Sequence, residues 1–172
     1  MNFIESWLPD KYVEDVFSID YEGLYRRGFR GLIFDIDNTL VAHGADSDSN
    51  IEKLFQEIHS LGFKTLLLSN NSRERVERFN RNINTLFINS ACKPCKDCFI
   101  HALKLMGTNP GETLMIGDTL FTDIRGANHA GLKSIMVKYI GYYSSEPKGI
   151  KRRIEKLILN LSKFYGKKKI IL

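Results

Sequence analysis

The sequence predicts an α/β protein, a Rossmann-like three-layer sandwich in which a central, mainly parallel sheet carries helices on both faces. Two observations predict it. Short apolar runs alternate with helical patterns along the chain, and the runs are continuously apolar, as in strands that are buried on both faces. Such alternation indicates βαβ units with right-handed crossovers. The expected strands are residues 31–35, 63–69, 85–88, 113–117 and 133–138.

Four helices are expected between these strands, because each pattern has a start or stop signal. Ser49 and Ser72 are suitable N-caps for the first two helices, and Pro94 suits the first turn of the third. A glycine follows the first, third and fourth patterns, where it favours a helix end. The predicted helices cover residues 49–61, 73–81, 94–106 and about 122–130.

The composition is that of an ordinary globular protein. Apolar residues make up 43% of the 172 residues and charged residues 26%. No apolar run is long enough to cross a membrane, and the first residues lack a basic-then-apolar signal pattern. The cysteines are three in number and clustered, so no disulfide framework is indicated. We therefore expect a cytoplasmic protein.

Positive charge is concentrated at the end of the chain. Residues 148–172 hold nine of the 25 Lys and Arg residues but one of the 20 Asp and Glu residues. Apolar residues recur there at helical spacing, which predicts a basic amphipathic helix over residues 148–169. Three interpretations stay open: the helix packs on the core, lies on an anionic membrane, or binds nucleic acid.

Polar residues follow the predicted strands where each strand ends. Asp35 and Asp37 follow the first strand and Ser69 ends the second, whereas Asp118 and Asp123 follow the fourth. Lys93 lies in the loop before a helix. Because active sites of such sheets lie beyond the carboxyl ends of the strands, these groups are expected to converge.

The convergent groups suit phosphoryl transfer. One of two closely spaced carboxylates can attack phosphorus while the other handles protons. Asp118 adds an oxygen ligand of the kind that Mg²⁺ prefers. Lys93 and the Ser69 hydroxyl can neutralise and hold phosphate oxygens, together with main-chain N–H groups.

At these residues the chain resembles the haloacid dehalogenase superfamily of phosphatases, over residues 31–138. Asp35-Ile36-Asp37-Asn38-Thr39 resembles its first motif, D-x-D-x-T. Ser69 resembles its second motif and Lys93 its third. The segment from Gly117 to Asp123 resembles its fourth, G-D-x-x-x-T-D.

The resemblance implies a role for each residue. Asp35 is expected to be the nucleophile, and Asp37 to protonate the leaving group and then activate water. Asp35, the Asp37 carbonyl oxygen and Asp118 are expected to hold Mg²⁺, with Asp123 binding the metal through water or orienting Lys93. Ser69 and Lys93 complete the catalytic set. Thr39 is expected to brace the first loop, and phosphate binding is assigned to Thr39, Asn70 and Lys93.

We expect one domain over residues 1–172, with an N-terminal extension at 1–30 and a catalytic core at 31–138. Only 31 residues separate Asp37 from Ser69, and 23 separate Ser69 from Lys93, so neither segment can hold a cap domain. An open site can admit a phosphate on a large molecule. The extension around Trp7 resembles the capless subclass IIIA, which is similar to bacterial and mitochondrial phosphatidylglycerophosphate phosphatases.

Three functions remain in view. The first is a lipid phosphatase acting at an anionic membrane surface, with the protein peripherally associated. The second is a soluble phosphatase for a nucleotide, sugar phosphate or phosphoprotein, and the third is a nucleic-acid- or ribosome-binding module. The oligomeric state is not predicted. Cys92, Cys95 and Cys98 have metal-like spacing, but ligands three residues apart on one helix cannot surround a tetrahedral ion, so reduced thiols are expected.

Overall fold

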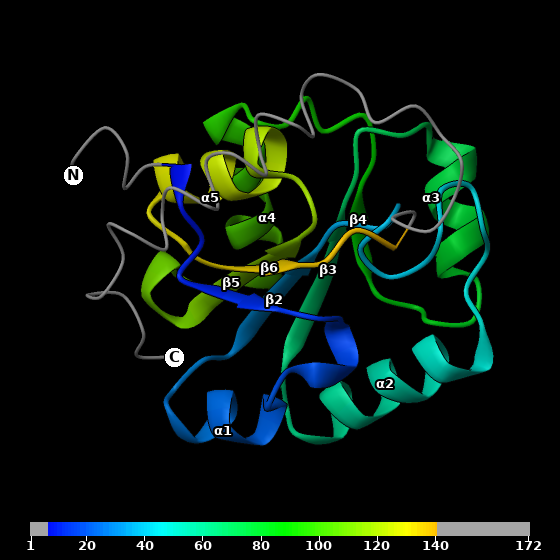
Figure 1. Ribbon diagram of the computed structural model, residues 1–172, viewed down its shortest axis with the longest axis horizontal. Helices are drawn as coiled ribbons and strands as arrows, with labels where there is room; N and C mark the ends of the chain where they lie inside the picture. The colour runs from blue at the N-terminus through cyan, green and yellow to red at the C-terminus, as the bar shows by residue number, and fades with distance from the viewer. Residues whose placement is uncertain (1–6, 141–172) are drawn as a thin grey trace.

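The computed structural model describes residues 7–140, whose centre is a six-stranded parallel sheet (Figure 1). The strand order is β1-β6-β5-β2-β3-β4. All neighbouring strands are parallel, which confirms the predicted Rossmann-like architecture. The strands are β1 (Lys11–Val13), β2 (Gly31–Phe34), β3 (Lys64–Leu68), β4 (Leu86–Ile88), β5 (Thr113–Gly117) and β6 (Lys133–Val137).

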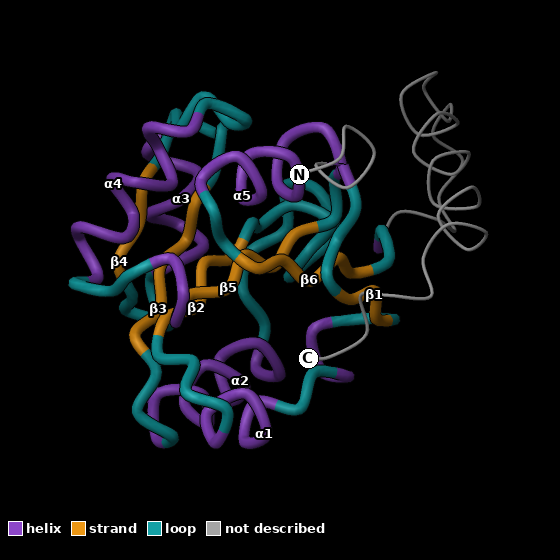
Figure 2. The backbone as a smooth tube through the Cα atoms, turned by 90° about the vertical axis from the view of Figure 1, so that its left-hand side faces the viewer, coloured by secondary structure: helices purple, strands orange, loops and turns teal. Residues whose placement is uncertain are grey.

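Helices cover both faces of the sheet. In Figure 1, α1 (Tyr21–Arg26) and α2 (Ser49–Ser60) lie below it, whereas α4 (Lys96–Met106) and α5 (Arg125–Ala130) lie above it. Side chains alternate between these two layers along each strand. On β2, Leu32 and Phe34 join the apolar cluster formed with α1 and α2, and Ile33 joins the cluster formed with α4 and α5. Figure 2 shows the layers edge-on.

The first predicted helices form with small changes at their ends. Asp48, not Ser49, caps α2, because its carboxylate accepts the N–H groups of Asn50 and Ile51, both at 2.9 Å. Ser72 caps α3 (Arg73–Asn80) as predicted. The predicted start of α4 was wrong. The N–H of Cys95 closes a turn onto the Cys92 carbonyl at 3.0 Å, so the helix begins at Lys96, after Pro94.

The last predicted helix is two segments. A π-helix over Leu120–Ile124 precedes α5, and Gly131 ends α5 in the left-handed conformation with φ of 80°. The side chain of Asp123 turns back to accept the Thr119 N–H at 3.1 Å, inside this first segment. The chain behind Asp118 therefore departs from a regular α-helix at the residues that carry Asp123.

Residues before the first predicted strand complete the sheet. β1 pairs with β6, so that Lys11 lies opposite Ile135. The ring of Trp7 packs edge-on against Phe121 at 5.5 Å, and the Arg125 guanidinium lies 4.5 Å from its centre. No helix within residues 7–140 is both long and apolar enough to cross a membrane. The predicted basic helix at 148–169 lies outside the described residues.

Candidate active site

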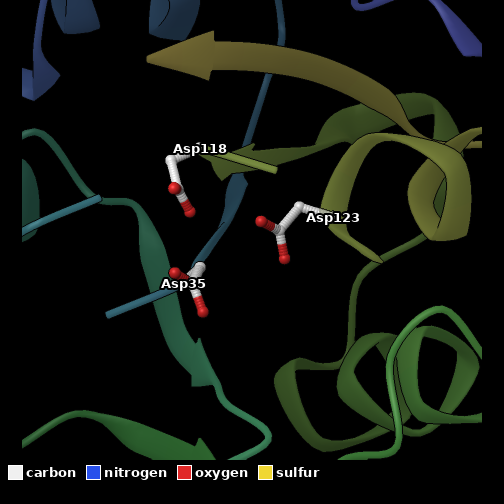
Figure 3. Close-up of side chains that lie close together, drawn as sticks. All are labelled: Asp35, Asp118 and Asp123. Atoms are coloured by element: carbon white, nitrogen blue, oxygen red, sulfur yellow. The ribbon is translucent and has the colours of Figure 1, made fainter. Parts of the chain in front are cut away.

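Three strand ends and one turn bring the predicted site residues to one edge of the sheet. Asp35 follows β2, Ser69 follows β3 and Asp118 follows β5. Figure 3 shows the side chains of Asp35, Asp118 and Asp123 directed into one space. One carboxylate oxygen from each lies within 4.8 Å of the others. The convergence predicted from the strand ends is therefore present in the structure.

Lys93 is the positive charge of this cluster. Its Nζ lies 2.7 Å from Asp35 Oδ1 and 2.7 Å from Asp123 Oδ1, and its side chain is 3% exposed. Burial lowers the pKa of the ammonium, but the neighbouring carboxylates of Asp123 and Asp35 outweigh burial and raise it. Lys93 is therefore a fixed cation between two acids.

Asn70 holds the backbone of Lys93 in place. Its Oδ1 accepts the Lys93 N–H at 2.8 Å, and its Nδ2 donates to the Lys93 carbonyl at 3.3 Å. We expected Asn70 to contact phosphate directly. Asn70 thus braces the lysine turn, and because its NH₂ group has a second hydrogen, its role in binding phosphate stays a prediction.

The hydroxyl of Thr39 is also engaged within the cluster. It is buried and donates to Asp35 Oδ2 at 3.0 Å, and it lies 3.4 Å from Asp118 Oδ1. A hydroxyl has one hydrogen to donate, and the shorter contact identifies Asp35 as its acceptor. The expected bracing contact of Thr39 is thus to the side chain of Asp35.

Burial dominates the electrostatics of the acids. It raises the pKa of Asp35 to about 6, against the lowering effect of Lys93 and with a further rise from Asp123. Burial also raises the pKa of Asp123, again against Lys93. Three acids and one lysine leave an excess of negative charge at this point, which favours a bound cation.

The donor set fits a hard divalent cation. Carboxylate oxygens are the ligands that Mg²⁺ prefers, and opposite ligands of that ion are about 4.2 Å apart. The three carboxylate oxygens lie within 4.8 Å of one another, which is close to this separation. Asp35, Asp118 and Asp123 form the only such group of three or more potential ligands within residues 7–140.

Asp37 lies in a separate polar environment. Its Oδ1 accepts the Gly44 N–H at 3.0 Å and Arg75 Nη2 at 2.8 Å, and its Oδ2 accepts Asn71 Nδ2 at 2.5 Å. Burial raises the pKa of Asp37, but the Gly44 N–H and the Arg75 guanidinium outweigh it, and the pKa is lowered. His43 Nδ1 lies 3.6 Å from Oδ2, on a largely exposed side chain.

Ser69 is linked to the polar environment of Asp37. Its side chain is buried, and its Oγ accepts the N–H of Asn71 at 3.2 Å and Asn71 Nδ2 at 3.0 Å. The same Asn71 amide group thus connects Ser69 to Asp37. The hydroxyl hydrogen of Ser69 is left to donate, as the predicted role in holding an anionic oxygen requires.

The whole-chain comparison decides the family. The chain is 32% identical over 161 residues to "Probable phosphatase YqeG" of Bacillus subtilis, and the match covers 93% of this chain and 94% of the relative. The chain belongs to the haloacid dehalogenase-like hydrolases. A family model described as haloacid dehalogenase-like hydrolase also matches residues 47–131. The chain is accordingly an enzyme, a phosphatase of the haloacid dehalogenase type, and its substrate carries a phosphate.

Several solved structures share the fold. An uncharacterized protein from Listeria monocytogenes superposes with a TM-score of 0.54 at 21% identity, covering 78% of this chain and 99% of that chain. The cobalt-bound deoxy-D-mannose-octulosonate 8-phosphate phosphatase of Haemophilus influenzae superposes with a TM-score of 0.53 at 15% identity, covering 81% and 90%. At these identities the likeness concerns the architecture alone.

Two further features concern the three cysteines near Lys93 and an arginine that contacts Asp37. The cysteines form no metal-ligand group within residues 7–140: Cys92 and Cys95 are exposed, and the buried Cys98 thiol donates to the Cys95 carbonyl at 3.0 Å. Arg75 was missed. It is one of several charged residues on α3, and no sequence signal distinguishes it from its neighbours.

Proposed function

We propose that this phosphatase hydrolyses phosphate monoesters through an aspartyl-phosphate on Asp35, with Mg²⁺ as its cofactor. The observation that carries the proposal is the position of Asp35. Its carboxylate lies between the buried cation of Lys93 and the hydroxyl of Thr39, within 4.8 Å of two further acids. A nucleophile held by a cation and a donor, beside a site for a hard metal, is suited to attack a phosphate.

In the first step, a carboxylate oxygen of Asp35 attacks phosphorus and the bond to the leaving oxygen breaks. The electron pair of that bond goes to the leaving oxygen, which takes a proton from the protonated form of Asp37. Lys93, Ser69 and nearby main-chain N–H groups hold the phosphoryl oxygens. Asp35, Asp118 and the Asp37 carbonyl oxygen would hold Mg²⁺, with Asp123 binding it through water or orienting Lys93, and the ion would supply neutralising charge.

In the second step, Asp37 takes a proton from a water molecule as that water attacks the phosphorus of the aspartyl-phosphate. The bond between phosphorus and Asp35 breaks, so the carboxylate of Asp35 is regenerated and inorganic phosphate is released. The sum is hydrolysis of one monoester by one water, and every protein group returns to its starting state.

Asp35→Asn tests the nucleophile, because it keeps the shape of the side chain but cannot form the acyl phosphate. We expect p-nitrophenyl phosphate hydrolysis in Mg²⁺ to fall by about three orders of magnitude or more. Acid quenching with ³²P-labelled substrate should leave label on the wild-type protein and none on the variant. Undiminished turnover by a folded Asp35→Asn protein would refute the proposal, as would full activity after dialysis against a chelator.

For the substrate, we propose a phospholipid phosphate such as phosphatidylglycerophosphate. Three observations support it. Only a loop, α2 and β3 lie between Asp37 and Ser69, and only α3 and β4 lie between Ser69 and Lys93, so neither segment adds a covering domain. The N-terminal segment resembles capless subclass IIIA. The excess positive charge at 148–172 suits an anionic membrane surface.

The lipid proposal is tested by replacing four basic residues of the tail, Lys151, Arg152, Arg153 and Lys156, with Gln. Each surface-adjacent cation contributes about 1 kcal/mol of attraction to an anionic membrane. We expect the variant to lose binding to anionic vesicles and to hydrolyse phosphatidylglycerophosphate in them more slowly, with unchanged activity on p-nitrophenyl phosphate. A wild-type protein that ignores anionic vesicles and prefers a sugar phosphate, nucleotide or phosphopeptide would refute it.

A further inference from the structure

Arg75 connects helix α3 to the predicted proton-transfer residue. Its side chain is 11% exposed, and its Nη2 donates to Asp37 Oδ1 at 2.8 Å and to the Ala45 carbonyl at 2.6 Å. The other two nitrogens, Nε and Nη1, are buried and have no hydrogen-bond partner among residues 7–140. Burying unpaired charged donors is costly to stability, so this arrangement is more typical of a functional contact than of a stabilising one.

A second arginine of α3 separates two explanations of this contact. Arg78 Nε pairs with Asp46 at 2.6 Å, and its Nη2 donates to the Gly44 carbonyl at 3.1 Å. Arg78 therefore fastens the same loop to the same helix without contacting Asp37. If Arg75 served only to hold the loop, the two arginines would be equivalent.

The contacts distinguish the two oxygens of Asp37. A carboxylate oxygen has about two acceptor positions. Both positions of Oδ1 are used, by the Gly44 N–H and by Arg75. Oδ2 accepts one hydrogen bond, from Asn71, and His43 Nδ1 at 3.6 Å is beyond hydrogen-bond distance. Oδ2 is thus the oxygen with an acceptor position left.

We propose that Arg75 is a positioning residue of the phosphatase reaction, which saturates Asp37 Oδ1 and thereby directs Oδ2 to the leaving oxygen and then to the attacking water. The inference rests on the proposed function of Asp37 in proton transfer. Arg75 does not touch the reacting atoms in this role. It fixes the rotation of the carboxyl group, and a misplaced catalytic group can lose about 10²-fold in rate.

The test compares two substrates that differ in leaving group, p-nitrophenyl phosphate and phenyl phosphate. Phenolate leaves less readily and depends more on proton donation. We expect Arg75→Gln to lower kcat on phenyl phosphate about tenfold more than on p-nitrophenyl phosphate, with KM changed by less than about twofold. Arg78→Gln is the matched control and should leave both substrates unaffected.

A double-mutant cycle links the effect to Asp37. Asp37→Asn should itself be impaired most on phenyl phosphate, and adding Arg75→Gln to it should change kcat by less than about twofold. If Arg75→Gln does not fold, as judged by its melting curve, Arg75→Met supplies the same comparison, because it keeps an apolar stem near Phe79 and removes every donor.

The outcomes separate the two proposals. Four results would overturn the role of Arg75 while leaving that of Asp37 in place. They are an equal loss of kcat on both substrates in Arg75→Gln, a gain in activity in that variant, an equal effect of Arg78→Gln, and additive effects in the double-mutant cycle. If Asp37→Asn instead shows the same ratio of kcat on the two substrates as wild type, proton transfer by Asp37 is overturned, and that transfer belongs to the proposed function.

Discussion

Removing the buried cation of the site should destabilise the metal-free protein strongly. Lys93→Met keeps most of the length of the side chain but breaks two contacts of 2.7 Å, to Asp35 and Asp123, and leaves the buried acids without a counter-charge. Breaking a buried ion pair on one side costs about 3–5 kcal/mol. For a protein of this size, 1 kcal/mol corresponds to about 2–4 °C in melting temperature, so we expect a decrease of about 6–20 °C.

The effect should depend on pH. The folded-state pKa of Asp35 is already raised to about 6, above its unfolded value, and removing Lys93 raises it further. An acid whose pKa is higher in the folded than in the unfolded state destabilises the fold when the pH is above the folded-state pKa. This destabilisation is lost as the pH falls below the folded-state pKa. The difference between variant and wild type should therefore be smaller at pH 5 than at pH 8.

Melting curves by circular dichroism in EDTA measure both effects. Lys96→Met is the matched control, because Lys96 is exposed in the first turn of α4, and its melting temperature should stay within about 2 °C of wild type. Adding Mg²⁺ should raise the melting temperature of Lys93→Met, since a ligand that binds only the folded state stabilises it. A variant that melts with wild type at pH 8 in EDTA, or a difference that widens at pH 5, would refute the reasoning.

Two further predictions concern the metal. Because burial raises the pKa of Asp35 to about 6, Mg²⁺ binding should release more protons at pH 6 than at pH 8. Calorimetric titrations in buffers of different ionisation enthalpy measure this release, and equal release at both pH values would contradict the prediction. Gly117→Ala would place a Cβ 2.5 Å from the Cβ of Asp123, so it should displace that carboxylate. We expect the Mg²⁺ concentration for half-maximal activity to rise about tenfold or more. An unchanged Mg²⁺ dependence would show that Asp123 is not needed for metal binding.

The sequence predicted the central strands and the convergence of acids well, because both depend on short-range patterns. A run such as Thr65 to Leu68 is apolar enough to identify a buried strand, and parallel strands place their carboxyl ends at one edge whatever the loops do. Asp35, Lys93 and Asp118 could therefore be grouped before any contact was known.

The missed elements are those without a local signal. β1 is three residues long, contains Lys11 and exposed Tyr12, and is a strand because β6 lies beside it. α1 has six residues and contains Gly23, and it is supported by the side chain of Asp20, which accepts the Gly23 N–H at 2.8 Å. Neither pattern is apolar or periodic over enough residues to be recognised.

The side-chain contacts of Asn70 and Arg75 were beyond the sequence for a different reason. Each depends on the direction of a side chain, which rotamers and packing determine after the fold has formed. A polar residue after a strand predicts that the residue is near the site. Whether its amide faces the phosphate or the backbone of Lys93 is decided by the turn in which that lysine lies.

The pairing of β1 with β6 affects how the chain can fold during synthesis. Lys11 and Ile135 are neighbours in the sheet although 124 positions separate them, and Asp10 bonds the main chain of Ser134 over the same separation. β1 therefore leaves the ribosome well before β6 and must wait for that strand before the two can pair. At about 5–20 residues per second, this delay is on the order of 6–25 s. During that time the central strands β2, β3 and β5 can assemble without it, so the edge of the sheet is expected to close last.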